Sequence, residues 1–122
     1  IYGSGAVVTY YGDTTQDDRE KAIYGFQNSP EVRFFVGNPQ VGGMGITLHA
    51  ATNMIYYAND FNLETRIQSE DRAHRMGQDK SVLYVDLIAP NTVDVHIVKS
   101  LLQKDKLAGK TLGEEVVEWL KV

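Results

Sequence analysis

The sequence contains no cysteine. This absence excludes a disulfide framework, a thiolate metal site and cysteine-based catalysis. No apolar run approaches the roughly 20 residues that a membrane-spanning helix needs. The first residues also lack the basic region and apolar stretch of a signal peptide. We therefore expect a cytoplasmic protein with no membrane partner.

Basic residues are also few, with 12 Lys and Arg against 16 Asp and Glu, for a net charge of −4. The resulting pI is about 5.3. Domains that bind nucleic acid through a broad basic face usually have a pI above about 9. Any nucleic-acid contact must therefore be local, through loops and backbone amides.

The length of 122 residues and the hydrophobic fraction of 43% are typical of one globular domain, which we expect to cover residues 1–122. Short apolar segments rich in β-formers alternate with helical patterns. The expected strands are residues 6–10, 32–36, 54–57 and 82–88. The first expected helix starts at Thr14 or Thr15. Further helices are expected over residues 48–51, 63–75 and 93–107, and a last short helix starts at Thr111.

This alternation predicts a parallel sheet with helices on both faces. Ligands of such sheets gather beyond the carboxyl ends of the strands. The glycine-rich loop at residues 37–45 and the segment at residues 59–62 both follow strands, so both fall on that edge. In the helix at 93–107, the apolar positions expected to face the core are Val93, Ile97, Leu101 and Leu102.

The stretch with most chemical content is QSEDRAHRMGQ, residues 68–78. On a helix, Gln68, Arg72 and Arg75 share one face. Arginine suits phosphate oxygens because its planar guanidinium donates bidentately and keeps its charge. A solvated face with an Asp71–Arg75 pair would produce the same pattern. His74 is expected to be structural, since no second ligand stands at metal-binding spacing.

The glycines at positions 42, 43 and 45 give a second feature. Glycine lets a backbone approach a ligand closely, and its amides can bind phosphate. A tight turn between a strand and a helix explains the same residues equally well.

The segment AGKT, residues 108–111, looks like the end of a phosphate-binding P-loop. The first glycine of that motif would fall at Lys104, and a helix rather than a strand precedes it. We interpret the segment as a turn between helices. The chain therefore has no complete P-loop to hold a nucleotide.

Residues 68–78 resemble the pattern Q-x-x-D-R-x-H-R-x-G-Q of Swi/Snf-type superfamily-two proteins. The segment GGMGITLHAA at 42–51 is similar to the preceding motif of that family, and residues 10–27 resemble an earlier one. Residues 59–62 fall where the family has an aromatic–Asn element. The resemblance implies an α/β fold: the second RecA-like lobe of an ATP-dependent DNA helicase or translocase. Such a lobe has three α/β/α layers and a mostly parallel sheet. Here it would be truncated at its N-terminus, with residues 108–122 as a C-terminal helical extension.

The family places ATP with Mg²⁺ between two lobes, and both would be held mainly by a first lobe of the same polypeptide that this chain lacks. The resemblance implies that Arg72 and Arg75 are catalytic arginine fingers, and that Gly45 and Gln68 also contact the nucleotide. It implies contacts with DNA, expected to be duplex and read without sequence specificity, at Asn38, Gln40, Gly42, Gly43, Phe61 and Asn62. No metal ligand is implied, Arg19 would brace the lobe, and the fragment alone would be inactive.

The sequence departs from the family pattern at four places. Asn38-Pro39-Gln40 stand in place of Ser or Thr followed by Lys, Thr47 in place of Asn, Ala58 in place of Asp, and Phe61-Asn62-Leu63 in place of Trp-Asn-Pro. They resemble a bacterial or phage branch. An alternative function is a non-catalytic orphan lobe that binds a protein or a nucleic acid. The acidic charge and the missing P-loop favour that alternative, whereas the intact pair of arginines disfavours it.

Overall fold

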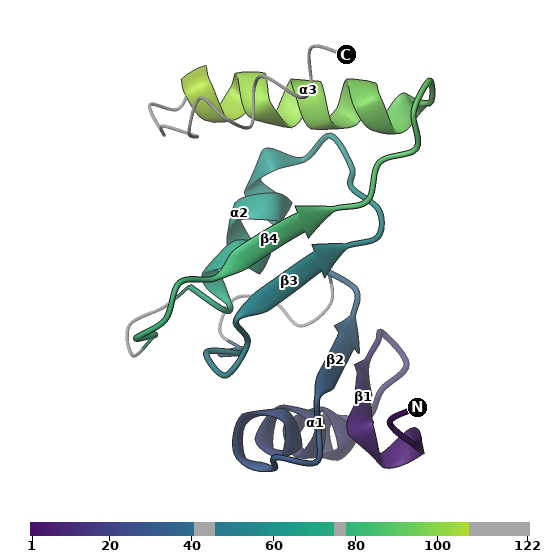
Figure 1. The fold of residues 1–122 in the computed structure, drawn as a ribbon, viewed down its shortest axis with the longest axis vertical. Helices are drawn as coiled ribbons and strands as arrows, with labels where there is room; N and C mark the ends of the chain where they lie inside the picture. Colours follow the sequence, from purple (N-terminus) through teal and green to yellow (C-terminus); the bar gives the residue numbers. More distant parts are fainter. Residues whose placement is uncertain (41–45, 75–77, 108–122) are drawn as a thin grey trace. The chain divides into compact units, whose positions relative to one another are not determined.

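The computed structural model describes residues 1–40, 46–74 and 78–107. Strands and helices alternate along the chain except between β2 and β3, which follow each other without a helix (Figure 1). In order they are the 3-10 helix η1 (Ser4–Ala6), β1 (Val7–Tyr10), α1 (Gln16–Asn28), β2 (Phe34–Gly37), β3 (Asn53–Tyr56), α2 (Leu63–Asp71), β4 (Leu83–Asp86) and α3 (Val93–Leu107). Residues 1–54 and 68–83 form one compact unit, and residues 55–67 and 84–122 form a second.

In the first unit, β1 pairs in parallel with β2, so that Val7 lies beside Phe34 and Tyr10 beside Gly37. A Cβ at Gly37 would meet the Tyr10 carbonyl oxygen at 3.2 Å, so the close approach favours glycine there. The ring of Phe35 contacts the rings of Tyr10 and Phe26, with centroids 5.7 Å and 5.6 Å apart. This aromatic cluster packs α1 against the strand pair.

Helix α1 starts where the sequence predicts a cap. The Thr15 hydroxyl accepts a hydrogen bond from the Asp18 amide at 3.2 Å, and Asp17 and Asp18 occupy the first turn. The helix ends at Asn28, and the Ser29 amide donates to the Gly25 carbonyl. A capping hydroxyl satisfies an amide that has no partner inside the helix, which explains the sharp start.

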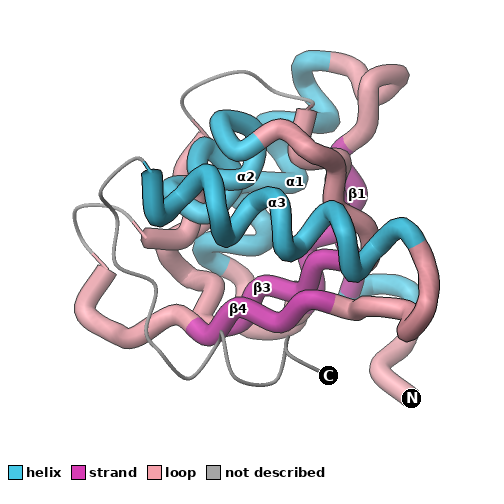
Figure 2. The backbone as a smooth tube through the Cα atoms, turned by 90° about the horizontal axis from the view of Figure 1, so that it is seen from above, coloured by secondary structure: helices cyan, strands magenta, loops and turns pink. Residues whose placement is uncertain are grey.

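The second strand pair consists of β3 and β4, which lie side by side (Figure 2). The Leu83 amide donates to the Thr52 carbonyl at 2.9 Å, and the Leu87 amide donates to the Tyr56 carbonyl at 3.0 Å. Donor and acceptor numbers rise together, so the two strands run in parallel. The prediction of an α/β fold with parallel strands is therefore confirmed.

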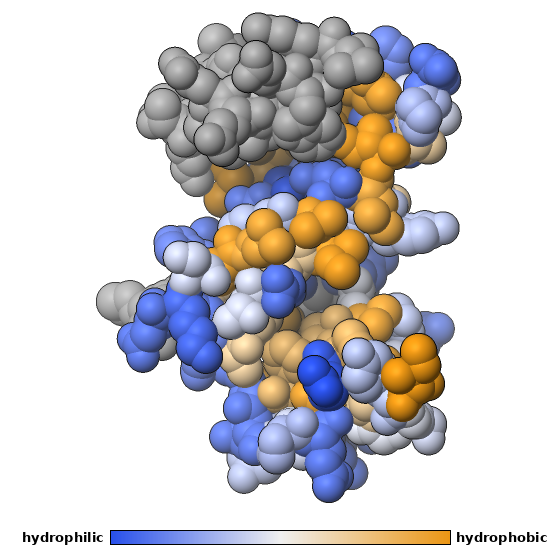
Figure 3. Space-filling model, viewed as in Figure 1, coloured by the Kyte–Doolittle hydropathy of each residue, from blue (hydrophilic) through white to orange (hydrophobic). Residues whose placement is uncertain are grey.

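One face of the β3–β4 pair carries exposed apolar side chains (Figure 3). Ile55 is 67% exposed, Tyr57 87% and Leu87 48%, whereas Tyr56 between the first two is only 6% exposed. The alternation is that of a strand with one buried face and one open face. In the described part of the chain, the face that carries Ile55 and Tyr57 is therefore the one open to solvent.

Helix α3 has the predicted bounds, but its buried side is shifted. Ile97 and Leu101 are buried as expected, Val98 is buried as well, and Val93 is 58% exposed at the first turn.

The short helix predicted at residues 48–51 is wrong. That segment forms a single turn, in which the Ala51 amide donates to the Leu48 carbonyl. Among the described residues, no helix is long and apolar enough to span a bilayer.

Candidate nucleotide and nucleic-acid site

Arg72 lies in the turn that directly follows α2. The Arg72 amide bonds to the Ser69 carbonyl at 3.3 Å, and the Ala73 amide bonds to the Glu70 carbonyl at 3.1 Å. Helix α2 therefore ends at Asp71, and the predicted continuation through residues 72–74 is wrong. The predicted face shared by Gln68, Arg72 and Arg75 stays a prediction, because Arg75 lies outside the described residues. Gln68 remains exposed near the end of α2.

In the turn just after the helix, two backbone carbonyl groups accept hydrogen bonds from donors outside the helix. The Arg72 carbonyl accepts from the Leu48 amide at 2.6 Å. The Ala73 carbonyl accepts from the Gln78 side chain at 3.2 Å. In a longer helix those oxygens would accept from amides four residues further on. Residues far along the chain thus set the position of Arg72.

The Arg72 side chain is half-buried and contacts the segment that follows β2. Its guanidinium donates to the Pro39 carbonyl at 2.9 Å. Pro39 lies between Asn38 and Gln40, two of the residues predicted to meet nucleic acid. The structure therefore brings one predicted nucleotide-site residue next to part of the predicted nucleic-acid loop, within the first unit.

Gln78 ties this turn to its surroundings. Its amide nitrogen donates to the carbonyls of His49 at 2.8 Å, Ala51 at 3.0 Å and Ala73 at 3.2 Å. Its amide oxygen accepts from the Lys80 amide at 3.1 Å. A primary amide has only two hydrogens, so the three acceptors share them. Gln78 closes the family pattern, but sequence reasoning assigned it no role.

A second glutamine extends this network to α1. The Gln27 side-chain oxygen accepts from the Ala50 amide at 2.8 Å, and its nitrogen lies 3.0 Å from His49 Nδ1. The segment at 48–51 is thereby held between α1 and the turn of Arg72. Sequence reasoning missed Gln27, since a half-buried glutamine in a helix has no local signature of such a role.

The predicted nucleic-acid residues after β2 are only partly described. The Asn38 side-chain oxygen accepts from the Gln40 amide at 3.0 Å, so Asn38 shapes the loop itself. Gln40 is exposed. Gly42, Gly43, Gly45 and Arg75 lie outside the described residues.

The segment at residues 59–62 belongs to the second unit. Asn62 caps α2, because its side-chain oxygen accepts from the Thr65 amide at 3.1 Å. Phe61 is 48% exposed, and its carbonyl accepts from Lys104 Nζ at 2.6 Å. A shallow hollow of about 610 Å³ lies here, lined by Asp60, Phe61, Asn62, Leu63, Glu64 and Lys104.

The charges around this hollow limit what it can bind. Asp60 and Glu64 are acidic, and Lys104 is the basic side chain of the lining. Such a surface does not attract a phosphate backbone by charge. The exposed ring of Phe61 is the group best suited to contact a base or a sugar. Beneath the segment, Arg66 forms an ion pair with Asp86 that sequence reasoning missed.

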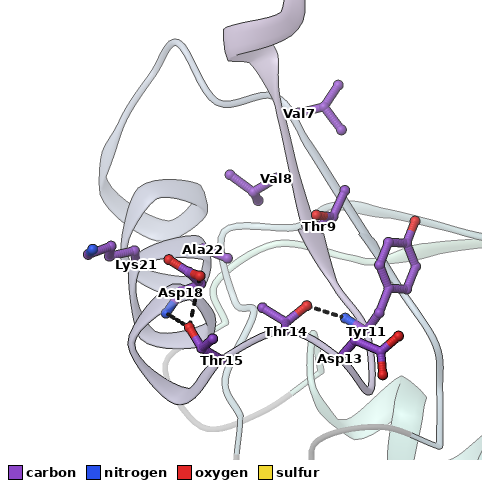
Figure 4. Close-up of a pocket in the computed structure, with 10 residues that line it drawn as sticks. All are labelled: Val7, Val8, Thr9, Tyr11, Asp13, Thr14, Thr15, Asp18, Lys21 and Ala22. Carbon is purple, nitrogen blue, oxygen red and sulfur yellow. Dashed lines mark hydrogen bonds between the residues drawn. The ribbon is translucent and has the colours of Figure 1, made fainter.

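A larger hollow of about 690 Å³ runs along β1 and the start of α1 (Figure 4). Its lining contains none of the predicted site residues. Its hydroxyl groups serve local structure, since Thr14 accepts from the Tyr11 amide at 3.0 Å and Thr15 donates to Asp18 at 2.8 Å. We assign no ligand to this hollow.

Arg19 has the bracing geometry predicted for it. Its guanidinium donates to the carbonyls of Tyr11 at 3.2 Å and Gly12 at 2.9 Å, and it lies 5.3 Å from the Tyr10 ring centroid. Arg19 thus fixes the turn between β1 and α1.

Within the described ranges, no group of at least three His, Cys, Asp or Glu side chains could hold a metal ion.

Comparison with protein families identifies residues 4–77 as matching the helicase conserved C-terminal domain. The human lymphoid-specific helicase is 40% identical over 96 residues, which cover 79% of this chain and 12% of that protein. The chromatin-remodeling ATPase INO80 of Gibberella zeae is 38% identical over 96 residues, covering 79% of this chain and 5% of that protein. The chain thus spans a small part of these curated relatives.

Two solved structures are similar in fold. The C-terminal part of the Fun30 ATPase domain has a TM-score of 0.72 at 30% identity and covers 93% of this chain and 38% of that chain. The Sulfolobus solfataricus SWI2/SNF2 ATPase core in complex with dsDNA has a TM-score of 0.62 at 31% identity and covers 83% of this chain and 21% of that chain. The curated relatives described here are human and fungal, so they do not support the expected bacterial or phage branch.

Proposed function

This chain belongs to the helicase conserved C-terminal domain family, as the C-terminal domain of a Swi2/Snf2-type ATPase, and we propose that it is the second lobe of an ATP-dependent DNA translocase. One observation supports this proposal most strongly. The Arg72 guanidinium contacts the segment that contains Asn38 and Gln40. An arginine suited to ATP phosphates and a segment suited to DNA are therefore in direct contact.

On the nucleotide side, Arg72 and Arg75 act as arginine fingers for ATP held by the first lobe. A guanidinium placed against the phosphates stabilises the negative charge that develops in phosphoryl transfer. Gln68 and Gly45 lie toward the nucleotide in this proposal. We assign the Mg²⁺ that accompanies ATP mainly to the first lobe, as the family resemblance implies. The isolated chain is then inactive.

On the nucleic-acid side, we assign the DNA contact to Asn38, Gln40, Gly42, Gly43, Phe61 and Asn62. The solved SWI2/SNF2 core was determined with dsDNA, which supports duplex DNA as the substrate. Contacts to the backbone carry no sequence information, so we expect no sequence specificity. ATP closes the two lobes and hydrolysis reopens them, so that the grip on DNA advances.

The Phe61→Ala variant of the whole parent protein tests the nucleic-acid side. Loss of an aromatic contact with a base or sugar should raise the DNA concentration for half-maximal ATPase stimulation about tenfold. The salt dependence of that concentration should stay unchanged, because phenylalanine carries no charge. Titration of duplex DNA at several salt concentrations measures both effects.

Tyr57→Ala is the matched control, since Tyr57 is an aromatic residue of the same unit that is 87% exposed outside the loop. Its half-stimulating DNA concentration should equal that of the unmodified protein. If the half-stimulating DNA concentration is the same for Phe61→Ala and Tyr57→Ala, then Phe61 does not contact DNA.

A second candidate function is the orphan lobe that binds a protein or a nucleic acid without catalysis. The net charge of −4 and the missing P-loop favour it for the isolated chain. Recovery of a stable partner other than the first lobe would support it. The expected cytoplasmic location stays a prediction.

A further inference from the structure

Arg66 of α2 forms a two-pronged ion pair with Asp86 at the end of β4. One guanidinium nitrogen lies 2.5 Å from Asp86 Oδ1, and the other lies 3.2 Å from Oδ2. The side chains are only 14% and 20% exposed. Bidentate, charge-assisted pairs of this kind fix direction as well as distance.

Two further side chains complete the arrangement within the second unit. Asn59 accepts from Arg66 at 2.8 Å through its oxygen and donates to Asp86 at 2.7 Å through its nitrogen. The Arg66 guanidinium carbon also lies 3.6 Å from the centroid of the buried Tyr56 ring. The amide of Asn59 thus bridges both members of the ion pair, and the ring of Tyr56 packs against the guanidinium.

These contacts hold the start of the segment at residues 59–62. Its other end is held by Asn62, which caps α2, and by the bond from Lys104 Nζ to the Phe61 carbonyl. Asp60 and Phe61 are exposed between these anchors. A loop fixed at both ends loses little further conformational entropy when its exposed side chain meets a ligand.

We propose that Arg66 is a positioning residue, which acts with Asp86 through Asn59 to hold Phe61 where it meets nucleic acid. This inference rests on the proposed contact between residues 59–62 and DNA. The alternative role is stability alone, but partly buried ion pairs stabilise a fold weakly compared with apolar packing. The bridge through Asn59 gives the pair a specific link to the loop that a purely stabilising pair does not require.

The test uses the whole parent protein and its Arg66→Met and Asp86→Asn variants. Hydrogen exchange at residues 59–62 should become about tenfold faster in both, since the loop loses its anchor. The half-stimulating DNA concentration should rise about tenfold, comparable to the loss of a single well-placed contact. The KM for ATP should stay unchanged. Lys99→Met, which removes an exposed positive charge from α3, should change none of these three readouts.

Arg66→Lys keeps the positive charge but loses the planar fork, so it also covers the case in which Arg66→Met fails to fold. It should show intermediate exchange at residues 59–62 and an intermediate DNA dependence. Exchange at the level of Lys99→Met in Arg66→Lys and Asp86→Asn would overturn the positioning role. Faster exchange with unchanged DNA dependence, in these variants and in Phe61→Ala, would refute the DNA contact itself and so the proposed function of this loop.

Discussion

Replacement of Arg72 or Arg75 by alanine in the whole parent protein is expected to lower ATP turnover roughly 10³-fold or more, the scale of an arginine finger. Each change removes a fixed positive charge that stabilises the transferring phosphoryl group. DNA binding should be largely retained, because the proposed DNA contacts lie on other residues. Steady-state ATP hydrolysis and DNA binding, measured on the same protein preparations, check both statements.

Arg33→Ala is the matched control for these arginine variants. Arg33 is exposed and lies in the first unit, where its guanidinium is 5.0 Å from the Tyr2 ring centroid. Its removal takes away the same charge without touching the proposed site, so turnover should stay unchanged. Normal turnover in both Arg72→Ala and Arg75→Ala would contradict the arginine-finger role.

Gln78→Glu is expected to lower turnover about 100-fold, because loss of the Gln78 bonds should displace Arg72 by roughly 1 Å. The substitution keeps the shape of the side chain but replaces the donating nitrogen with an oxygen. That oxygen would face the carbonyls of His49, Ala51 and Ala73, which now accept from the nitrogen. The part-buried carbonyl groups of Ala51 and Ala73, left without this donor, would destabilise the turn that holds Arg72.

Gln103→Glu makes the same chemical change on an exposed position of α3 and should leave turnover unchanged. Gln78→Ala should resemble Gln78→Glu but with a smaller loss, since alanine removes the donor without adding a repelling oxygen. If Gln78→Glu turns over ATP like Gln103→Glu, then the bonds of Gln78 do not position Arg72.

Helix α1 and helix α3 were predictable because their determinants are local. Thr15 caps α1 with a hydroxyl that the sequence places directly before acidic residues. The apolar spacing of α3 predicts the buried Ile97 and Leu101. The exposure of Val93 was not predicted, because the pattern does not show that the first turn of the helix faces solvent.

The end of α2 was not predictable from local sequence. The pattern from residue 63 to residue 75 is helical, yet the Leu48 amide and the Gln78 side chain take the carbonyls of Arg72 and Ala73. Such competition depends on segments that only the fold brings together. The role of Arg66 was not predictable for the same reason, because its partner Asp86 lies 20 residues further along the chain.

The candidate site was predictable to the extent that a motif named its residues. The family pattern pointed to Arg72, and the structure adds its bond to the Pro39 carbonyl. The residues that hold the site, Gln27, Gln78 and Arg66, carry side chains that are common on protein surfaces. Sequence alone cannot separate them from solvated residues, because their role arises only from the carbonyls and side chains they face.

The most direct test of the central claim is ATP hydrolysis by the whole parent protein with and without duplex DNA, measured beside the isolated 122-residue chain. We predict turnover that duplex DNA stimulates in the parent protein and no turnover in the isolated chain, which lacks the P-loop. Absence of turnover in the parent protein, or turnover that DNA does not change, would contradict a DNA-translocating motor and favour the orphan binding module.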